Sequence, residues 1–268
     1  MKQRIDVLLV EKDFYPTRER AKKNIMAGRV LVNEQIIDKP GTMVDVNAPI
    51  RIKEDAIPYV SRGGLKLEKA MKTFDLSLES KICMDIGSST GGFTDCMLRS
   101  GARKVYCVDV GYGQLDWSLR TDERVVVKER TNIRKLGVEE LEDNPDFFSI
   151  DVSFISLKLV LPKLRELGRP GFSAVALIKP QFEVGREDVG KNGVVRDPEK
   201  HKKAIVMCLA YLKENDLRLR GLTWSPIKGP KGNIEYLMYI EDSVEKDVRI
   251  SIDEVVDLSH LNTDIQEG

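Results

Sequence analysis

The chain has 268 residues, a length that fits one large domain or a small domain joined to a medium one. Hydrophobic residues make up 41% of it, which is enough for a globular core and excludes a disordered chain. The 43 basic and 43 acidic residues cancel, so any contact with nucleic acid must depend on local clusters of positive charge.

The cysteines and the apolar runs indicate the cellular compartment of the protein. None of the four cysteines belongs to a CxxC pair: Cys83, Cys96, Cys107 and Cys208. Because the chain has only two histidines, we expect no metal site, and free thiols fit a reducing compartment. No apolar run approaches the roughly 18 residues of a membrane span, and the amino-terminal segment is too charged for a signal peptide. We therefore expect a cytoplasmic protein without a membrane partner.

Residues 1–55 are predicted to form a small α+β domain. Apolar spacing over 5–9 predicts a first helix, and a second is expected from Thr17, a suitable N-cap, to Ala27, with Gly28 directly after it. Short strands are expected around the β-branched residues that follow: Val30, Val32, Ile36, Val44, Val46, Ile50 and Ile52. A linker is expected at 56–60.

Residues 61–268 are predicted to form a second domain in which strands alternate with helices. This alternation predicts a parallel sheet with helices on both faces, that is, an α/β fold with a Rossmann-like sheet. The expected strands are 82–86, 104–108, 124–127, 147–152 and 174–178, with two later strands at 217–225 and 234–240. The expected helices are 93–100, 114–120, 156–167 and 198–215, with a short terminal helix behind a capping box at Ser251 and Glu254.

Positive charge gathers around the second helix of the first domain. Its five cations stand against the single anion Glu19: Arg18, Arg20, Lys22, Lys23 and Arg29. Such a cluster suits phosphates, although a solvated helix face has the same composition. The segment 25–33, Ile-Met-Ala-Gly-Arg-Val-Leu-Val-Asn, resembles the S4 RNA-binding domain, and the resemblance extends over most of the first domain. It implies binding to structured RNA, mainly through backbone and shape.

A glycine-rich loop follows the first predicted strand of the sheet. Its residues are Gly87, Ser88, Ser89, Thr90, Gly91, Gly92 and Phe93. Glycines at this place let a ligand approach the backbone, but the spacing is not the GxGxxG of dinucleotide sites. Asp109 ends the next strand, where a carboxylate can accept both hydroxyls of a ribose. Asp85, just before the loop, is a candidate to contact the opposite end of a cofactor whose ribose is bound by Asp109.

Four charged residues are the candidate catalytic set: Lys66, Asp151, Lys179 and Glu235. Asp151 and Lys179 end parallel strands, and the carboxyl ends of such strands form the ligand crevice. A lysine at the end of an apolar strand needs a partner or a chemical role. From the residues alone, a structural network of ion pairs is as good an interpretation as catalysis.

The sequence from Tyr59 to Tyr239 resembles the TlyA family of rRNA 2′-O-methyltransferases, and the second domain is similar, more widely, to the FtsJ-like methyltransferases. The matching segments, in order, are YVSRGGLKL, DIGSSTGGFTD, VDVGYGQL, ERTNIR, DVSFISL, LIKPQFEVG and GPKGNIEY. The resemblance implies S-adenosylmethionine as cofactor, with Asp85, residues 87–93, Asp109 and Asp151 around it. It also implies a Lys-Asp-Lys-Glu tetrad at the four charged positions and transfer of methyl to the ribose of a cytidine in 16S or 23S rRNA. Ribosomal subunits are then the partners, and no stable protein partner is implied.

In such a reaction the ribose hydroxyl must lose its proton. Lys179 acts as a general base only if it is neutral; if it stays protonated, it stabilises the developing oxyanion instead. Lys66 and Glu235 would hold the ribose, and Asp151 would orient Lys179. Phe154 and Phe182 are candidates for stacking on an extruded base, and the loop 183–197 is a candidate lid. Candidate contacts to RNA phosphates are Arg4, Arg18, Lys39, Arg62, Arg130, Arg134 and Arg186.

Two other functions stay open. Members of the family have been described as haemolysins, which suggests a membrane-active protein, although no segment of this sequence has the features of one. The other alternative is an RNA-binding ribosome assembly factor that does not catalyse. Lysis of red cells would favour the first, and failure to bind S-adenosylmethionine would favour the second.

Overall fold

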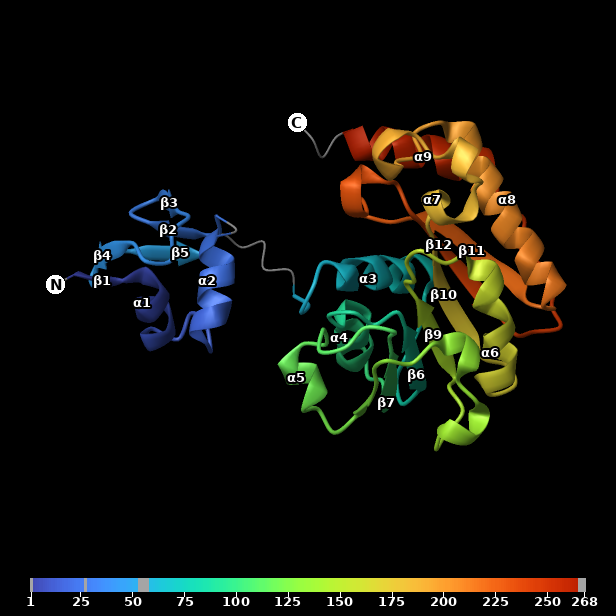
Figure 1. Ribbon diagram of the computed structural model, residues 1–268, viewed down its shortest axis with the longest axis horizontal. Coiled ribbons are helices and arrows are strands. Elements are labelled where there is room, and N and C mark those ends of the chain that lie inside the picture. Colours follow the sequence, from blue (N-terminus) through green and yellow to red (C-terminus); the bar gives the residue numbers. More distant parts are fainter. Residues whose placement is uncertain (1, 27, 53–57, 265–268) are drawn as a thin grey trace. The chain divides into compact units, whose positions relative to one another are not determined.

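The computed structural model describes residues 2–26, 28–52 and 58–264 and divides into two compact units, residues 1–57 and 58–268 (Figure 1). Of the linker expected at 56–60, residues 56 and 57 lie outside the described residues. Ala27, the expected end of the second helix, lies outside them too.

The first unit combines two helices, α1 (Ile5–Glu11) and α2 (Arg18–Met26), with short antiparallel strands. The strands are β1 (Lys2–Arg4), β2 (Val30–Val32), β3 (Gln35–Ile37), β4 (Met43–Asp45) and β5 (Ile50–Ile52). β2 lies between β3 and β5, and β1, which was not predicted, pairs with β4. Asn33 and Glu34 connect β2 to β3 with φ values of 50° and 61°, the left-handed geometry of a tight hairpin.

Apolar residues of both helices and of the strands form the core of the first unit. Ile5, Leu8 and Leu9 are buried, as the helical spacing predicts. Ala21 and Ile25 of α2 pack against them. The Oγ1 of Thr17 accepts a hydrogen bond from the Arg20 amide at 3.3 Å, so the predicted cap of the second helix is confirmed.

The second unit contains a seven-stranded sheet in the order β11-β12-β10-β9-β6-β7-β8. Its parallel strands are β6 (Ile82–Ile86), β7 (Lys104–Val108), β8 (Val125–Lys128), β9 (Phe147–Ile150) and β10 (Ser173–Ile178). β12 (Tyr236–Glu241) runs antiparallel between β10 and β11 (Arg218–Trp224). The predicted α/β fold with a Rossmann-like sheet is therefore confirmed.

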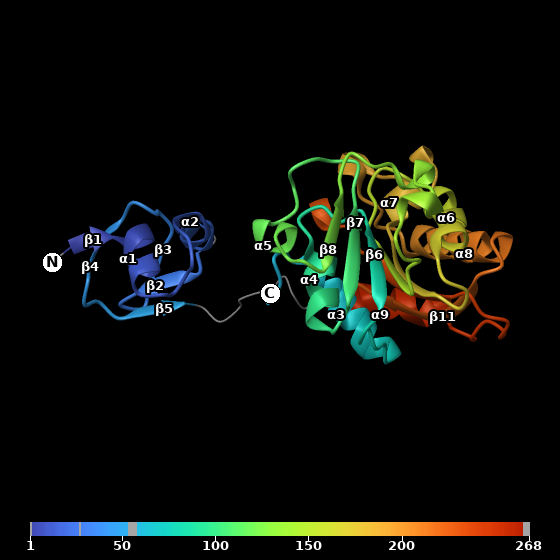
Figure 2. The same cartoon turned by 90° about the horizontal axis from the view of Figure 1, so that it is seen from below.

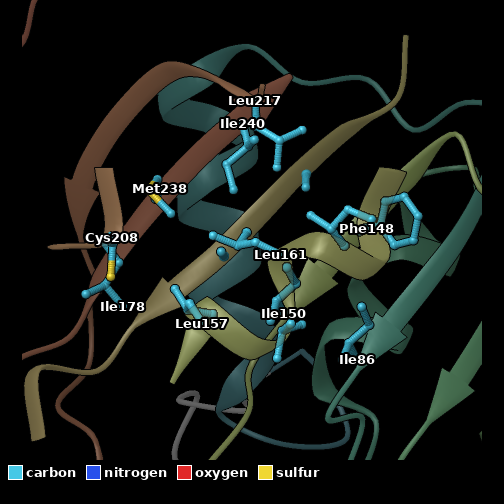
Figure 3. Close-up of a cluster of buried hydrophobic side chains, with 14 of the residues drawn as sticks. Ile86, Phe148, Ile150, Leu157, Leu161, Ile178, Cys208, Leu217, Met238 and Ile240 are labelled. Atoms are coloured by element: carbon cyan, nitrogen blue, oxygen red, sulfur yellow. The ribbon is translucent and has the colours of Figure 1, made fainter. Parts of the chain in front are cut away.

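Helices cover both faces of this sheet because the strands are apolar on both sides (Figure 2). Along β6, Ile82, Met84 and Ile86 face a core that includes α6 (Leu161–Leu167), α8 (Pro198–Glu214) and α9 (Ile252–Asp264). Figure 3 shows part of this cluster. Cys83 faces the opposite core, formed with α3 (Gly63–Phe74) and α4 (Gly92–Arg99). This alternation is the period of two that a β-strand imposes.

Several elements differ from the sequence prediction. Helix α3 was not predicted, because the paired glycines at its start weaken the helical signal. The helix expected at 114–120 is only α5 (Trp117–Arg120), and the one expected at 156–167 is a 3₁₀ turn followed by α6 with Pro162 in its first turn. The strand expected at 147–152 ends at Ile150, and the one expected at 234–240 begins at Tyr236.

The terminal helix α9 is confirmed, and the Ser251 Oγ accepts a hydrogen bond from the Glu254 amide at 3.3 Å. The loop 183–197 contains two 3₁₀ turns, and Val184 and Val195 pack in a small core with Ala204. Within the described ranges, no helix combines the length and the apolar character needed to cross a membrane.

Candidate active site

The candidate catalytic residues meet at the carboxyl edge of the parallel strands. Asp151 directly follows β9, and Lys179 directly follows β10. Glu235 directly precedes β12, which is antiparallel to β10 with Ile178 opposite Tyr236, so the start of β12 lies at the same edge. Lys66 comes from the first turns of α3. Four segments that are remote in sequence therefore contribute to one cluster, called here the charged cluster: Lys66, Asp151, Lys179 and Glu235.

Direct contacts join the charged cluster. The Nζ of Lys179 lies 2.5 Å from Oδ1 of Asp151 and donates to the Ser153 Oγ at 3.0 Å. The Nζ of Lys66 lies 2.7 Å from Oε2 of Glu235 and 3.5 Å from Oδ2 of Asp151. Asp151 thus bridges the two lysines, and Glu235 pairs with Lys66. Ser153 was not identified from the sequence, although a hydroxyl two residues after Asp151 was the available signal.

Burial and charge act in opposite directions on these groups. Burial lowers the pKa of Lys66, but Asp151 and Glu235 outweigh it and hold that pKa above its ordinary value. Burial raises the pKa of Asp151, but Lys66 and Lys179 outweigh it and hold that pKa below its ordinary value. Lys66 is therefore a cation and Asp151 an anion at neutral pH.

Glu235 is wholly buried, and only one of its carboxylate oxygens has a protein partner within the described residues. A Cβ on Gly229 would overlap the other oxygen, Oε1, so only glycine allows the backbone to pass this close. Burial raises the pKa of Glu235, with Lys66 opposing that shift. The backbone at Gly229 therefore lies directly against the carboxylate of Glu235. Gly229 was not singled out from the sequence.

The glycine-rich loop adjoins the charged cluster. Gly87 has a φ of +85°, and a Cβ there would lie 2.5 Å from the carbonyl oxygen of Asp151. A Cβ on Gly92 would lie 2.8 Å from the amide nitrogen of Gly64, where α3 begins. Both glycines allow contacts that a side chain would prevent, which brings the loop against the segments carrying Asp151 and Lys66.

Asp109 follows β7, and its carboxylate is held by backbone amides. Oδ2 accepts from the Ser89 amide at 2.8 Å, and Oδ1 accepts from the Gly111 amide at 2.7 Å. Ser89 has a φ of 47°, an uncommon conformation that aims its amide at Asp109. The carboxylate is partly exposed beside the glycine loop, where it retains acceptor capacity for a ligand's hydroxyl groups.

Asp85 has a different environment. Its carboxylate is buried and accepts bonds from the Thr94 amide at 3.0 Å, the Thr94 hydroxyl at 2.7 Å and the Ser149 hydroxyl at 3.0 Å. These bonds fasten the start of α4 to β6 and β9. Burial raises the pKa of Asp85 to about 7, although the hydrogen bonds oppose the shift. A contact from Asp85 to a cofactor stays a prediction.

The seven candidate RNA contacts are all exposed: Arg4, Arg18, Lys39, Arg62, Arg130, Arg134 and Arg186. Arg130 stacks on Tyr112, 4.2 Å from its ring centre, and the sequence analysis did not identify Tyr112. Phe154 is 91% exposed with a φ of 62°, and its ring centre lies 5.1 Å from that of Phe182. The Phe154 ring is therefore largely exposed, three residues along the chain from Asp151, and its stacking on a base stays a prediction.

Comparisons with known proteins match both units of the chain. Residues 59–241 match the FtsJ-like methyltransferase model, and residues 3–50 match the S4 domain model. The chain is 54% identical over 240 residues to YqxC of Bacillus subtilis, which bears the name of an rRNA methyltransferase, with 89% of this chain and 85% of that protein covered. It is 40% identical to the 16S/23S rRNA (cytidine-2′-O)-methyltransferase TlyA of Mycobacterium tuberculosis, with 91% of each covered.

A solved structure described as a hemolysin from Streptococcus thermophilus is similar throughout, with a TM-score of 0.79, 47% identity and coverage of 99% of this chain and 98% of that one. The S4 match, the FtsJ-like match and the TlyA relative together cover most of the chain. The chain belongs to the TlyA family, FtsJ-like methyltransferases that carry an S4 domain ahead of the catalytic domain.

Proposed function

We propose that the protein transfers a methyl group from S-adenosylmethionine to the ribose 2′-hydroxyl of a cytidine in ribosomal RNA. The observation that carries this proposal is the charged cluster, in which two lysines and two carboxylates meet beside the glycine-rich loop. The activity of the TlyA relative supports the choice of substrate. Residues 61–268 would then be the catalytic domain and residues 1–55 an RNA-binding domain.

The loop and Asp109 fit S-adenosylmethionine. Asp109 would accept the ribose hydroxyls of the cofactor while the Ser89 and Gly111 amides keep its carboxylate in place. Residues 87–93 would lie against the cofactor, where glycine permits close approach. When bound, S-adenosylmethionine supplies an electrophilic methyl group on a positively charged sulfur.

The charged cluster would act on the ribose hydroxyl. A ribose hydroxyl that takes up a methyl group must give up its proton, so the site would need an acceptor for that proton. Lys66 is held protonated by Asp151 and Glu235, so its role is to orient and to stabilise negative charge. Lys179 is therefore the proposed base or, if it remains an ammonium, the group that stabilises the oxyanion. Asp151 holds it in place in either role.

Exposed arginines on both units would contact RNA phosphates, and Phe154 would stack on the extruded base. An enzyme with this substrate would meet ribosomal subunits in the cytoplasm.

The test is transfer of labelled methyl from S-adenosylmethionine to each ribosomal subunit separately, using subunits that lack the modification. Nucleoside analysis would then identify 2′-O-methylcytidine. We expect label on at least one subunit, and Lys179→Ala should lower the rate by at least about a hundredfold if Lys179 transfers the proton. Lys179→Arg keeps a cation that cannot act as a base, so its activity separates the two roles of Lys179. Lys72→Ala, an exposed lysine on α3, is the matched control.

Other outcomes would point elsewhere. No label on either subunit, although S-adenosylmethionine binds, would favour a different RNA substrate or an assembly factor. Lysis of red cells by purified protein without cofactor would favour the haemolysin interpretation that some relatives' names suggest.

A further inference from the structure

The carboxylate of Asp6 joins two arginines on the first unit. Asp6 lies in the first turn of α1, and its side chain is fully buried. Its Oδ1 accepts from the Nε of Arg4 at 3.0 Å, and its Oδ2 accepts from the Nη2 of Arg4 at 3.2 Å and from the Nη2 of Arg18 at 2.8 Å. Arg4 precedes α1 and Arg18 begins α2, so one buried carboxylate holds the starts of both helices together.

The charges in this group do not cancel. Two guanidinium groups share one carboxylate, which leaves one positive charge in excess. Both arginines stay about half exposed, with relative side-chain accessibilities of 49% and 48%. In the part of the chain that the structure describes, Arg18 uses only Nη2 in these bonds, and Arg4 uses Nε and Nη2. Several of their ten N–H donors are therefore available to a ligand.

Asp6 also stays ionised. The hydrogen bond from Arg4 is the main cause that lowers the pKa of Asp6 to about 2, with Arg18 adding to the effect and burial opposing it. The carboxylate therefore stays charged and hydrogen-bonded to both guanidinium groups throughout the physiological range of pH.

The turn after β3 leaves the surface beside Arg4 open. The amides of Ile5 and Asp6 donate to the carbonyls of Thr42 and Pro40, at 2.9 Å and 3.3 Å, which packs this turn against the start of α1. A Cβ at Gly41 would lie in van der Waals contact with the guanidinium, 3.8 Å from the Nη2 of Arg4, so glycine at this position leaves that side of the guanidinium uncovered.

We propose that Asp6 assembles Arg4 and Arg18 into one binding site for backbone phosphates of structured RNA. The proposal rests on the proposed RNA substrate. Fork-shaped guanidinium groups bind phosphate through two parallel hydrogen bonds, and a fixed pair of them loses less conformational freedom on binding than two separate side chains. Asp6 is a positioning residue in this site, because it acts on RNA only through the arginines.

The sign of one effect tests this role. Asp6→Asn removes a negative charge near the RNA, so charge alone predicts tighter binding. Loss of positioning predicts the opposite, about tenfold weaker binding to ribosomal subunits and a shallower dependence of affinity on salt, by about one to two phosphate contacts. Glu34→Gln is the matched control, because Glu34 pairs with Arg51 at 2.5 Å in the same unit and carries the same charge. We expect it to leave binding unchanged or slightly tighter.

A second pair of variants covers a failure to fold. Arg18→Lys keeps the charge but loses the fork, and we expect several-fold weaker binding, whereas Arg51→Lys in the same unit, whose guanidinium pairs with Glu34, should bind normally. Circular dichroism checks that each variant is folded. The proposed site is overturned if folded Asp6→Asn binds ribosomal subunits as tightly as wild type. If Asp6→Asn does not fold, the proposed site is overturned when Arg18→Lys binds as tightly as wild type. If wild-type protein binds neither ribosomal subunit, the proposed function fails together with the site. If wild-type protein binds but the variants bind equally well, only the site fails.

Discussion

Two lysines of helix α3 each pair with a carboxylate at the same distance, but one pair is buried and the other is exposed. Lys66 and Glu235 are 2.7 Å apart inside the second unit, and Lys72 and Glu68 are 2.7 Å apart on the surface. Substitution of each lysine by methionine removes the charge and keeps most of the unbranched side chain, which becomes slightly shorter. The comparison therefore measures how an ion pair of the buried charged cluster differs in energy from an ion pair at the surface.

The two substitutions should differ several-fold in energy. Lys72→Met should lower the free energy of unfolding by only about 0.3 to 0.5 kcal/mol, because the pair is exposed. Lys66→Met leaves the carboxylate of Glu235 buried without its cation, and such an unpaired charge costs about 3 to 5 kcal/mol. Asp151 keeps Lys179 as a partner, so the loss falls mainly on Glu235. The double variant Lys66→Met/Glu235→Gln should recover more than about 1 kcal/mol of it.

Urea unfolding followed by tryptophan fluorescence is suited to this test, since both tryptophans, Trp117 and Trp224, lie in the second unit. The loss in Lys66→Met should shrink at acidic pH, where Glu235 without its partner takes up a proton. A loss below about 1 kcal/mol, or a double variant whose losses simply add, would show that burial does not couple these two groups.

Two further predictions concern the neighbourhood of the cluster. Burial raises the pKa of Asp85 to about 7, so between about pH 4 and 7 the folded state retains a proton that the unfolded state has lost. Stability should therefore fall as pH rises through this range. Asp85→Asn should remove roughly 1 to 3 kcal/mol of this decline, measured as the pH dependence of the urea midpoint. An equal decline in both proteins would contradict it. Phe154→Ala should slow methyl transfer about tenfold or more through loss of base stacking while the melting temperature stays within about two degrees, because the ring is 91% exposed; unchanged transfer rates would remove Phe154 from the site.

Much of the fold follows from local pattern. Strands of a parallel sheet are buried on both faces and therefore form short apolar runs, such as those at 82–86 and 104–108. These runs allowed the strands to be predicted from the sequence. The glycine spacing at 87–92 and the carboxylate of Asp109 are likewise local, since they follow directly from the ends of strands. Helix α3 was not predicted because Gly63 and Gly64 lower its local helical preference. The helix is stabilised by packing its apolar residues against the sheet, and that contact is not visible in the local sequence.

The pairing of charges could not be predicted in this way. Lys66 and Glu235 are 169 residues apart, and they meet because β12 runs antiparallel to β10, which turns the start of β12 toward the carboxyl edge of the sheet. Nothing in the local sequence fixes that direction, since strand alternation is the same in both orientations. Asp6 likewise reaches Arg18 only through the packing of α1 on α2. The sequence alone determined which residues are charged and which strands are buried; tertiary structure decided which charges touch, because ion pairs depend on distance in space and not on separation along the chain.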